Sequence, residues 1–154
     1  MTEKTAAEVE AEVGRILQGL YDAVKRAQLD PWMETLHDPS GLWLLGMDVV
    51  NLREAIEELG TTWTSEGESQ LARQEIDDLE IRVVAVSPTV AYALCTSPDR
   101  RWYFTNGKVE RASTAETWVF ALTDDGWKLH FGQSSLFPIK DETFTELLTQ
   151  ALGE

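Results

Sequence analysis

The chain has 154 residues, 43% of them hydrophobic, which is the size and composition of a single domain spanning residues 1–154 with one core. Acidic residues outnumber basic ones by 27 to 13, and the formal net charge of -14 would repel nucleic-acid phosphates and anionic membrane surfaces. We therefore expect neither a nucleic-acid partner nor a membrane partner. Met1 is followed by polar residues and not by the basic start and apolar run of a signal peptide, which predicts a soluble cytoplasmic protein.

The first third of the chain predicts three helices and one short strand. Apolar residues recur at steps of three and four over residues 6–27, the period of a helix with one buried stripe. Asp30 followed by Pro31 is typical of an N-cap and a first helical turn, and predicts a short second helix. The apolar run Leu42–Leu45 predicts a small edge strand, and residues 49–63 return to a helical period.

The rest of the chain predicts a sheet. From residue 71 the hydrophobic period changes to two, and residues 71–137 predict four long strands joined by short turns. Ser87 and Pro88 separate a strand over residues 76–86 from one over residues 89–104. Helices followed by such a sheet predict a helix-covered cone with a pocket inside. The final residues, 140–154, predict a terminal amphipathic helix.

A hairpin between the second and third long strands is predicted by Asn106 and Gly107, the residue types of a two-residue primed turn. That turn would place Thr105 opposite Lys108 and pair small residues with large ones on one face. The predicted pairs are Cys95 with Trp118, Ala93 with Phe120, and Ala91 with Leu122.

The strand that contains Cys95 carries two further expectations. Cys95 is the one cysteine of the chain and lies in an apolar alternating run, which predicts a buried and unreactive thiol. Pro98 and Asp99 cannot both fit a regular ladder, so we expect a β-bulge there that bends the sheet.

The order of these elements resembles that of the nuclear transport factor 2-like superfamily, and within it the SnoaL-like and ketosteroid-isomerase-like domains. The resemblance extends from Val9 to Phe137. It is carried by the Leu29-Asp30 junction, by Val90-Ala91 after a Ser-Pro turn, and by DDGWKLHFGQSS over residues 124–135. It implies an α+β, cystatin-like fold in which a cone-shaped, curved antiparallel sheet packs against N-terminal helices. The superfamily contains isomerases, cyclases, dehydratases, ligand-binding proteins and association domains, so the fold alone selects no function.

The resemblance also implies where a catalytic site would lie. In ketosteroid isomerases the general base is an aspartate on the first short strand, whereas a helix tyrosine and a strand acid form the oxyanion hole. Here residues 41–46 contain no carboxylate before Asp48, so the base is missing. Tyr21 lies about one position from the expected helix tyrosine, and Glu116 is the nearest match to the strand acid.

Glu116 is the leading candidate for chemistry because it shares a strand face with Trp118, Phe120 and Leu122. A carboxylate in such surroundings must either stay protonated or find a hydrogen-bond partner, which suits an acid or donor role. The alternative is structural, because Glu116 could form an ion pair with Arg100 or Arg101.

His130 is the second candidate, and its orientation depends on the turn at residues 124–126. A two-residue turn would place three other side chains on the face of Glu116: Leu129, Phe131 and Gln133. A three-residue turn would instead place His130 and Ser134 there, giving a Glu-His pair that could exchange protons near neutral pH.

We accordingly predict Glu116 and His130 as candidate catalytic residues. The candidate ligand-binding residues are Tyr21, Trp43, Trp118, Phe131 and Gln133. No metal-ligand spacing and no phosphate-binding motif is present in the sequence, so we expect neither a metal site nor a cofactor.

Two functions remain open from the sequence. The first is a homodimeric domain that binds a small apolar ligand. If it is an isomerase, cyclase or dehydratase, Glu116 or His130 would act as the acid or base. The second is a non-catalytic dimerisation or association module whose cone is filled by its own side chains. A homodimer is expected in both, because strands with apolar residues on both faces need two covers and the helices supply one.

Overall fold

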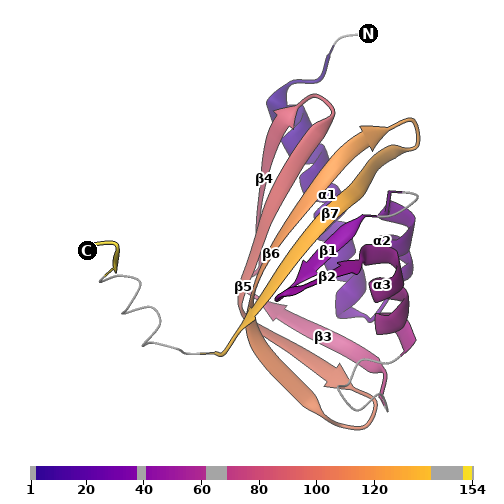
Figure 1. Cartoon of the computed structure of the whole chain (residues 1–154), viewed down its shortest axis with the longest axis vertical. Helices are drawn as coiled ribbons and strands as arrows, with labels where there is room; N and C mark the ends of the chain where they lie inside the picture. The colour runs from indigo at the N-terminus through magenta and orange to yellow at the C-terminus, as the bar shows by residue number, and fades with distance from the viewer. Residues whose placement is uncertain (1–2, 38–40, 62–68, 140–150, 154) are drawn as a thin grey trace.

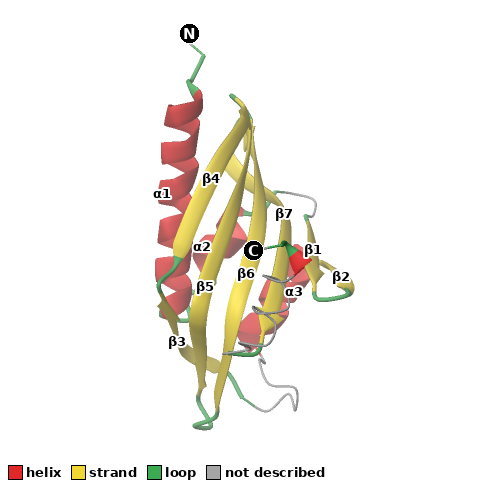
Figure 2. Ribbon diagram, turned by 90° about the vertical axis from the view of Figure 1, so that its left-hand side faces the viewer, coloured by secondary structure: helices red, strands yellow, loops and turns green. Residues whose placement is uncertain are grey.

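The structure is a computed structural model that describes residues 3–37, 41–61, 69–139 and 151–153, without the side chains of residues 59–61. In this part of the chain a curved sheet of seven strands carries helices against one face (Figures 1 and 2). The elements in chain order are α1 (Ala6–Lys25), α2 (Asp30–Thr35), β1 (Leu42–Leu45), β2 (Asp48–Asn51), α3 (Leu52–Thr61), β3 (Leu71–Asp77), β4 (Glu80–Ser87), β5 (Val90–Phe104), β6 (Val109–Thr123) and β7 (Gly126–Phe137).

The first helix, α1, begins at a capping box and buries one stripe. The Thr5 hydroxyl accepts a hydrogen bond from the Glu8 amide, and the Glu8 carboxylate accepts one from the Thr5 amide. The helix ends at Lys25, and Ala27 follows with a positive φ of 55°. The buried stripe consists of Val9, Val13, Leu17, Leu20, Tyr21, Ala23 and Val24. This stripe packs on β4 and β3, and Figure 2 shows α1 running beside β4 on one side of the sheet.

The second and third helices differ in detail from the sequence predictions. α2 has Pro31 in its first turn, as predicted, but Asp30 is not the cap, because Leu29 occupies that position and makes no side-chain hydrogen bond. Residues 48–51 form β2 and not the start of a helix. α3 begins at Leu52, after Asn51 accepts a hydrogen bond from a backbone amide of the first turn.

The sheet order is β2-β1-β7-β6-β5-β3, and β4 also pairs with β5. β1 pairs with β2 on one side and, in parallel, with β7 on the other, so β1 is an internal strand and the predicted edge position belongs to β2. All other pairings are antiparallel. The predicted terminal helix lies outside the described residues except for residues 151–153, and so does the end of the helix predicted over residues 49–63, from residue 62 on.

The sheet bends where the partner strand of β5 is broken. The single strand expected over residues 76–86 is wrong, because Asp78 adopts a φ of 47° and separates β3 from β4. β4 pairs with the first half of β5 and β3 with the second half. Figure 1 shows β4 and β3 on the two sides of the resulting bend.

The predicted bulge at Pro98 and Asp99 is confirmed, since the pairing of β5 with β6 shifts between Ser97 and Arg100. The Ser97 hydroxyl lies 2.6 Å from the Asp77 carbonyl oxygen and donates a hydrogen bond to it, which fixes the bulge to the end of β3. Because side chains alternate along a strand, the bulge also changes which residues face inward. Before it the odd-numbered side chains are buried, and after it Arg100 and Trp102 are.

The β5–β6 hairpin is looser than predicted. Thr105 and Lys108 lie in the loop and do not pair, and of the two predicted turn residues only Gly107 has a positive φ, of 85°. The Thr105 amide donates instead to the Gln70 carbonyl oxygen. The pairing of small with large residues persists in a register shifted by two: Cys95 opposes Glu116, Ala93 opposes Trp118, and Ala91 opposes Phe120.

A second bulge, which the sequence did not predict, lies in β7 at His130. Thr123 pairs with Gly126, so the β6–β7 turn has the two-residue length. The register then shifts, because His130 is an extra residue between Leu129, which opposes Phe120, and Phe131. Leu129 therefore faces inward near the turn, whereas beyond the bulge the inward residues are Gly132 and Ser134.

Gly132 permits a very close contact with the core residue Trp118. A Cβ atom at this position would lie 2.2 Å from Cζ3 of Trp118, far inside van der Waals contact. Trp118 is buried and in turn packs against Trp32 and Trp43, with ring centroids 5.1 and 6.3 Å away. The absence of a side chain at Gly132 therefore determines where the Trp118 ring can lie.

We predict opposite effects for two glycine-to-alanine changes. Gly132→Ala should destabilise the protein by about 2 kcal/mol or more, because Trp118 must move within a packed core. Gly19→Ala, in the exposed face of α1 where a Cβ meets nothing within 4 Å, should stabilise it by about 0.5–1 kcal/mol. Urea unfolding followed by fluorescence measures both, and equal effects would contradict the packing role of Gly132.

Candidate functional site

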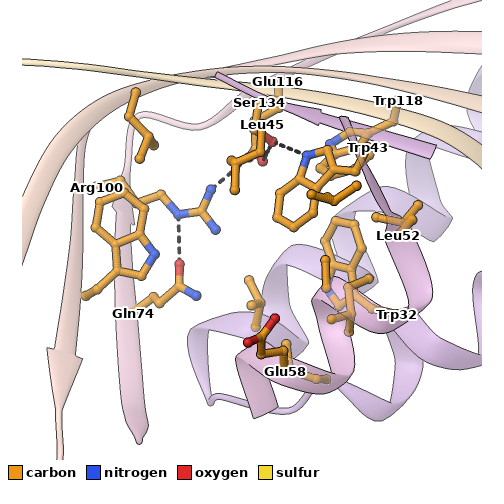
Figure 3. A pocket seen from close by; sticks show the side chains of 17 residues that line it. Trp32, Trp43, Leu45, Leu52, Glu58, Gln74, Arg100, Glu116, Trp118 and Ser134 are labelled. Carbon is orange, nitrogen blue, oxygen red and sulfur yellow. Dashed lines mark hydrogen bonds and ion pairs between the residues drawn. The ribbon is translucent and has the colours of Figure 1, made fainter. Parts of the chain in front are cut away.

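A cavity of about 450 Å³ lies between the concave face of the sheet and the helices (Figure 3). Its wall is mostly apolar, with side chains from α2, β1, β2 and α3 on one side and from β6 on the other. The apolar lining includes Trp32, Trp43, Val50, Leu52, Ile56 and Trp118. The polar lining consists of Glu58, Gln74, Arg100, Glu116 and Ser134.

Glu116 is the centre of the polar part. Its Oε1 accepts hydrogen bonds from the Tyr21 hydroxyl at 2.9 Å and from Nη1 of Arg100 at 2.7 Å. Its Oε2 accepts one from the Ser134 hydroxyl at 2.8 Å. An ionised carboxylate offers about four acceptor positions, so three donors leave one lone pair, on Oε2.

Each of these partners is held by a further side chain. Nε1 of Trp118 donates to the Tyr21 hydroxyl, and Nε1 of Trp43 donates to the Ser134 hydroxyl, both at 2.9 Å. Nε of Arg100 donates to Oε1 of Gln74 at 2.7 Å. The hydrogen bonds therefore form one continuous network that joins α1, β1, β3, β5, β6 and β7 around one carboxylate.

Burial makes each member of the ion pair at the centre of this network dependent on the other. The exposed fractions of Arg100 and Glu116 are only 7% and 9%. A buried charge without a partner costs several kcal/mol, so each group requires the other. The structural ion pair considered from the sequence is thus present, and its cation is Arg100, whereas Arg101 pairs with Glu75 and Asp77 on the outer side.

Two groups beside the pair are held in their neutral forms. Burial, reinforced by the charge of Glu116, raises the pKa of Tyr21 well above its ordinary value, so this phenol remains a hydrogen-bond donor. Burial likewise raises the pKa of Cys95 to about 12. A thiol with that pKa forms almost no thiolate near neutral pH, which agrees with the unreactive cysteine expected from the sequence.

The structure brings together four of the seven candidate residues from the sequence. Trp43, Glu116 and Trp118 line the cavity, and Tyr21 contacts it through its bond to Glu116. Although Tyr21 lies about one position from the helix tyrosine that the resemblance implies, its side chain still points to the site.

The other three candidates lie elsewhere, because the β7 bulge changes the facing of the strand. His130 is exposed and packs edge-on against His37, with ring centroids 4.9 Å apart, so it does not form the Glu-His pair. Phe131 and Gln133 lie on the outer face, opposite Val119 and Thr117, and do not line the cavity. Ser134 takes the inward position that a longer turn would also have given it.

Sequence reasoning did not identify Gln74, Trp32 or Trp102 as cavity residues. Trp102 and Arg100 face inward because of the first bulge. That bulge was predicted, and the inward facing of these two residues would have followed from it. Gly132 was the available signal for the second bulge, since a glycine inside a strand often marks one or marks a close approach. Nothing in the local sequence distinguishes Gln74 from the other polar residues of β3.

Among the described residues, no group of three His, Cys, Asp or Glu side chains is placed to hold a metal ion. In the same part of the chain, no helix has both the length and the apolar character needed to cross a membrane.

Removing the charge of Glu116 should test the ion pair. We predict that Glu116→Gln lowers the free energy of unfolding by about 3–5 kcal/mol, because Arg100 then stays buried without a counter-ion. The double variant Glu116→Leu with Arg100→Met should recover most of that loss, since it leaves no buried charge. Chemical denaturation measures both. If the loss of stability in the double variant equalled the sum of the losses in Glu116→Leu and in Arg100→Met, the two residues would not be coupled.

No protein-family model matches this chain, and no curated protein matches it in sequence. Solved structures do match it. A ketosteroid isomerase-like protein from Erwinia carotovora atroseptica superposes with a TM-score of 0.62 at 18% identity, over 84% of this chain and 96% of that one. A hexachlorocyclohexane dehydrochlorinase from Novosphingobium barchaimii gives 0.63 at 12% identity, over 82% and 84%.

An NTF2-like protein from Prochlorococcus marinus gives a TM-score of 0.59 at 19% identity, over 84% of this chain and 94% of that one. A protein with a cystatin-like fold from Caulobacter vibrioides is also similar. Identities this low establish the architecture and not the activity. The α+β, cystatin-like cone expected from the sequence is confirmed, and the chain has the nuclear transport factor 2-like fold shared by ketosteroid isomerase-like proteins.

Proposed function

We propose that this protein binds a small, largely apolar molecule in the cavity between its helices and its sheet. The observation that carries the proposal is a cavity of about 450 Å³ with an aromatic wall and one buried, hydrogen-bonded carboxylate. Small-molecule sites typically have volumes of roughly 300–1,000 Å³, apolar walls and a few convergent polar groups. A cone filled by its own side chains would leave no such volume, so the cavity favours ligand binding over a purely structural role.

Glu116 is the residue that we propose for acid–base chemistry on that ligand. It lines the cavity, its charge is balanced by Arg100, and one lone pair of its carboxylate remains for a ligand. A reaction at this site would be a cofactor-independent isomerisation, cyclisation or elimination of a ketone, lactone or epoxide-like substrate, with Glu116 accepting or returning a proton. Similar structures that are named as a dehydrochlorinase and as ketosteroid isomerase-like support this class of reaction. His130 has no place in the proposed site because it lies outside the cavity.

We further propose that the protein is a homodimer whose two copies are joined through the outer face of the sheet. We also propose that it is a cytoplasmic protein. In the part of the chain that the structure describes, α1, α2 and α3 lie against the inner face of the sheet. Across β5, β6 and β7, the outer face carries a row of Tyr92, Val119 and Phe131, which are neighbours in register and half-buried, beside Leu94, which is 43% exposed. A sheet with apolar residues on both faces needs a second cover, and a second copy would place the same row against itself.

Filling the cavity should abolish binding without unfolding the protein. Ala55 of α3 lines the cavity, and Ala55→Leu would place extra carbon atoms in the space that a ligand needs. We predict that the wild type is stabilised in thermal-shift measurements by hydrophobic ketones such as adamantanone, by about 2.7 kcal/mol at a concentration one hundred times Kd, and that Ala55→Leu is not.

The control is Ala11→Leu, the same substitution on the exposed surface of α1, which should leave ligand stabilisation intact. An enolisable bicyclic ketone of similar size, 2-decalone, in deuterated water tests the chemistry. A base in the cavity would exchange its α-hydrogens in the wild type, and the Glu116→Gln variant would not exchange them. Binding without exchange would retain the ligand site and remove proton abstraction from the ketone. No stabilisation by any member of the ligand series would count against the binding function.

A charge on the outer face should separate the dimer. We predict that wild-type protein sediments as a dimer at micromolar concentration and that Leu94→Glu sediments as a monomer, because a buried unpaired carboxylate opposes association. Val109→Glu, at an exposed position near the β5–β6 hairpin and away from this row, should remain dimeric. A monomeric wild type in sedimentation velocity would refute the dimer.

A further inference from the structure

Two buried hydrogen-bond donors in the cavity wall have no partner. Nε2 of Gln74 and Nε1 of Trp102 make no hydrogen bond within the described part of the chain, although the residues are only 3% and 5% exposed. Both residues line the cavity. Buried donors in folded proteins are almost always paired, so two orphans in one wall require an explanation.

The two donors lie next to each other. Gln74 of β3 and Trp102 of β5 are direct partners in the sheet, and both side chains are on its inner face. The amide orientation of Gln74 is fixed, because its Oε1 accepts the hydrogen bond from Nε of Arg100 and its Nε2 must therefore point elsewhere. Figure 3 shows Gln74 and Arg100 side by side at one end of the cavity, with the Gln74 amide nitrogen directed to its interior.

We propose that Gln74 and Trp102 form an acceptor-binding subsite that holds a neutral carbonyl oxygen of the ligand. This inference rests on the proposed function and specifies which ligand the cavity takes. A carbonyl oxygen has two lone pairs and can accept from both N–H groups, so one atom satisfies both donors. The guanidinium of Arg100, 5.1 Å from the Trp102 ring, adds a positive field beside that oxygen. The remaining ligand atoms would lie against the tryptophans and aliphatic residues of the opposite wall.

The charges of the wall favour a neutral acceptor over an anion. Among the described lining residues Arg100 is the one cation, and its charge is already balanced by Glu116 at 2.7 Å. An anionic ligand would leave an unbalanced negative charge in this mostly apolar cavity, and an ammonium group has no lone pair for the two donors. Ketones, esters and lactones meet both requirements.

The test compares adamantanone with methyleneadamantane, which has the same shape but carries a carbon atom in place of the carbonyl oxygen. Trp102→Phe removes the indole N–H and keeps an aromatic ring. We expect the Kd of adamantanone to rise about tenfold in this variant, the loss of roughly one hydrogen bond, whereas the Kd of methyleneadamantane stays within about twofold. Trp127→Phe is the control, because Trp127 is buried but does not line the cavity, and it should change neither Kd.

A spectroscopic measurement accompanies the titration. The indole N–H resonance of Trp102, assigned by its loss in Trp102→Phe, should move downfield on addition of adamantanone and not on addition of methyleneadamantane. Adamantanecarboxylate should bind the wild type more weakly than adamantanone.

The outcomes separate the two proposals. If Trp102→Phe weakened both adamantane compounds equally, or weakened neither, the subsite would be overturned while the ligand cavity stood. Tighter binding of the carboxylate than of the ketone would overturn the preference for a neutral acceptor. If no adamantane compound bound the wild type, the cavity would fail as a site for such ligands, and the subsite would fail with it.

Discussion

The buried ion pair between Arg100 and Glu116 is the interaction on which the arrangement of this protein depends. Two opposite charges with less than a tenth of their surface exposed are tolerated only when the geometry is good and the remaining polar atoms are hydrogen-bonded. Tyr21, Ser134 and Gln74 meet that requirement, and they come from α1, β7 and β3. The pair therefore fixes the first helix and four strands around one point, and that point is the polar end of the cavity.

Two bulges decide which side chains surround the pair. Without the bulge at Pro98 and Asp99, the alternation of β5 would turn Arg100 outward, and without the one at His130 the alternation of β7 would turn Ser134 outward. In each strand the extra residue exchanges the inner and outer sets beyond it. The bulges also bend the sheet, so the same local irregularities produce the concave surface and supply its polar residues. The shape of the site and its chemistry therefore both depend on the two β-bulges.

Features that depend on alternation within one element could be predicted from the sequence, and features that depend on a bulge or on tertiary pairing were harder to predict. Hydrophobic period identified α1, the strand region and the inward facing of Glu116, because these depend on alternation within one element. The first bulge was predictable from Pro98, which cannot donate to a ladder. In β7 the only signal was Gly132, which is weaker because a glycine does not by itself break a ladder, and the predicted facing of Phe131 and Gln133 was wrong for that reason. The break at Asp78 and the strand at residues 48–51 depend on tertiary pairing with β5 and β1, which a local pattern does not encode.

Two features that cost stability, an unfilled space and a pair of adjacent unpaired donors, lie together at the cavity. A chain selected for stability alone would fill a space of about 450 Å³ and would not bury two unpaired N–H groups beside it, because each unsatisfied donor costs about 1–3 kcal/mol. Elsewhere in the same core the packing is close enough that Gly132 cannot accept a single methyl group. Tight packing on one side of Trp118 and empty, donor-lined space on the other are properties of one scaffold, and conflicts of this kind are expected where a fold keeps a binding site. The unpaired donors then become the part of the cavity that a ligand completes, and their chemistry limits what that ligand can be.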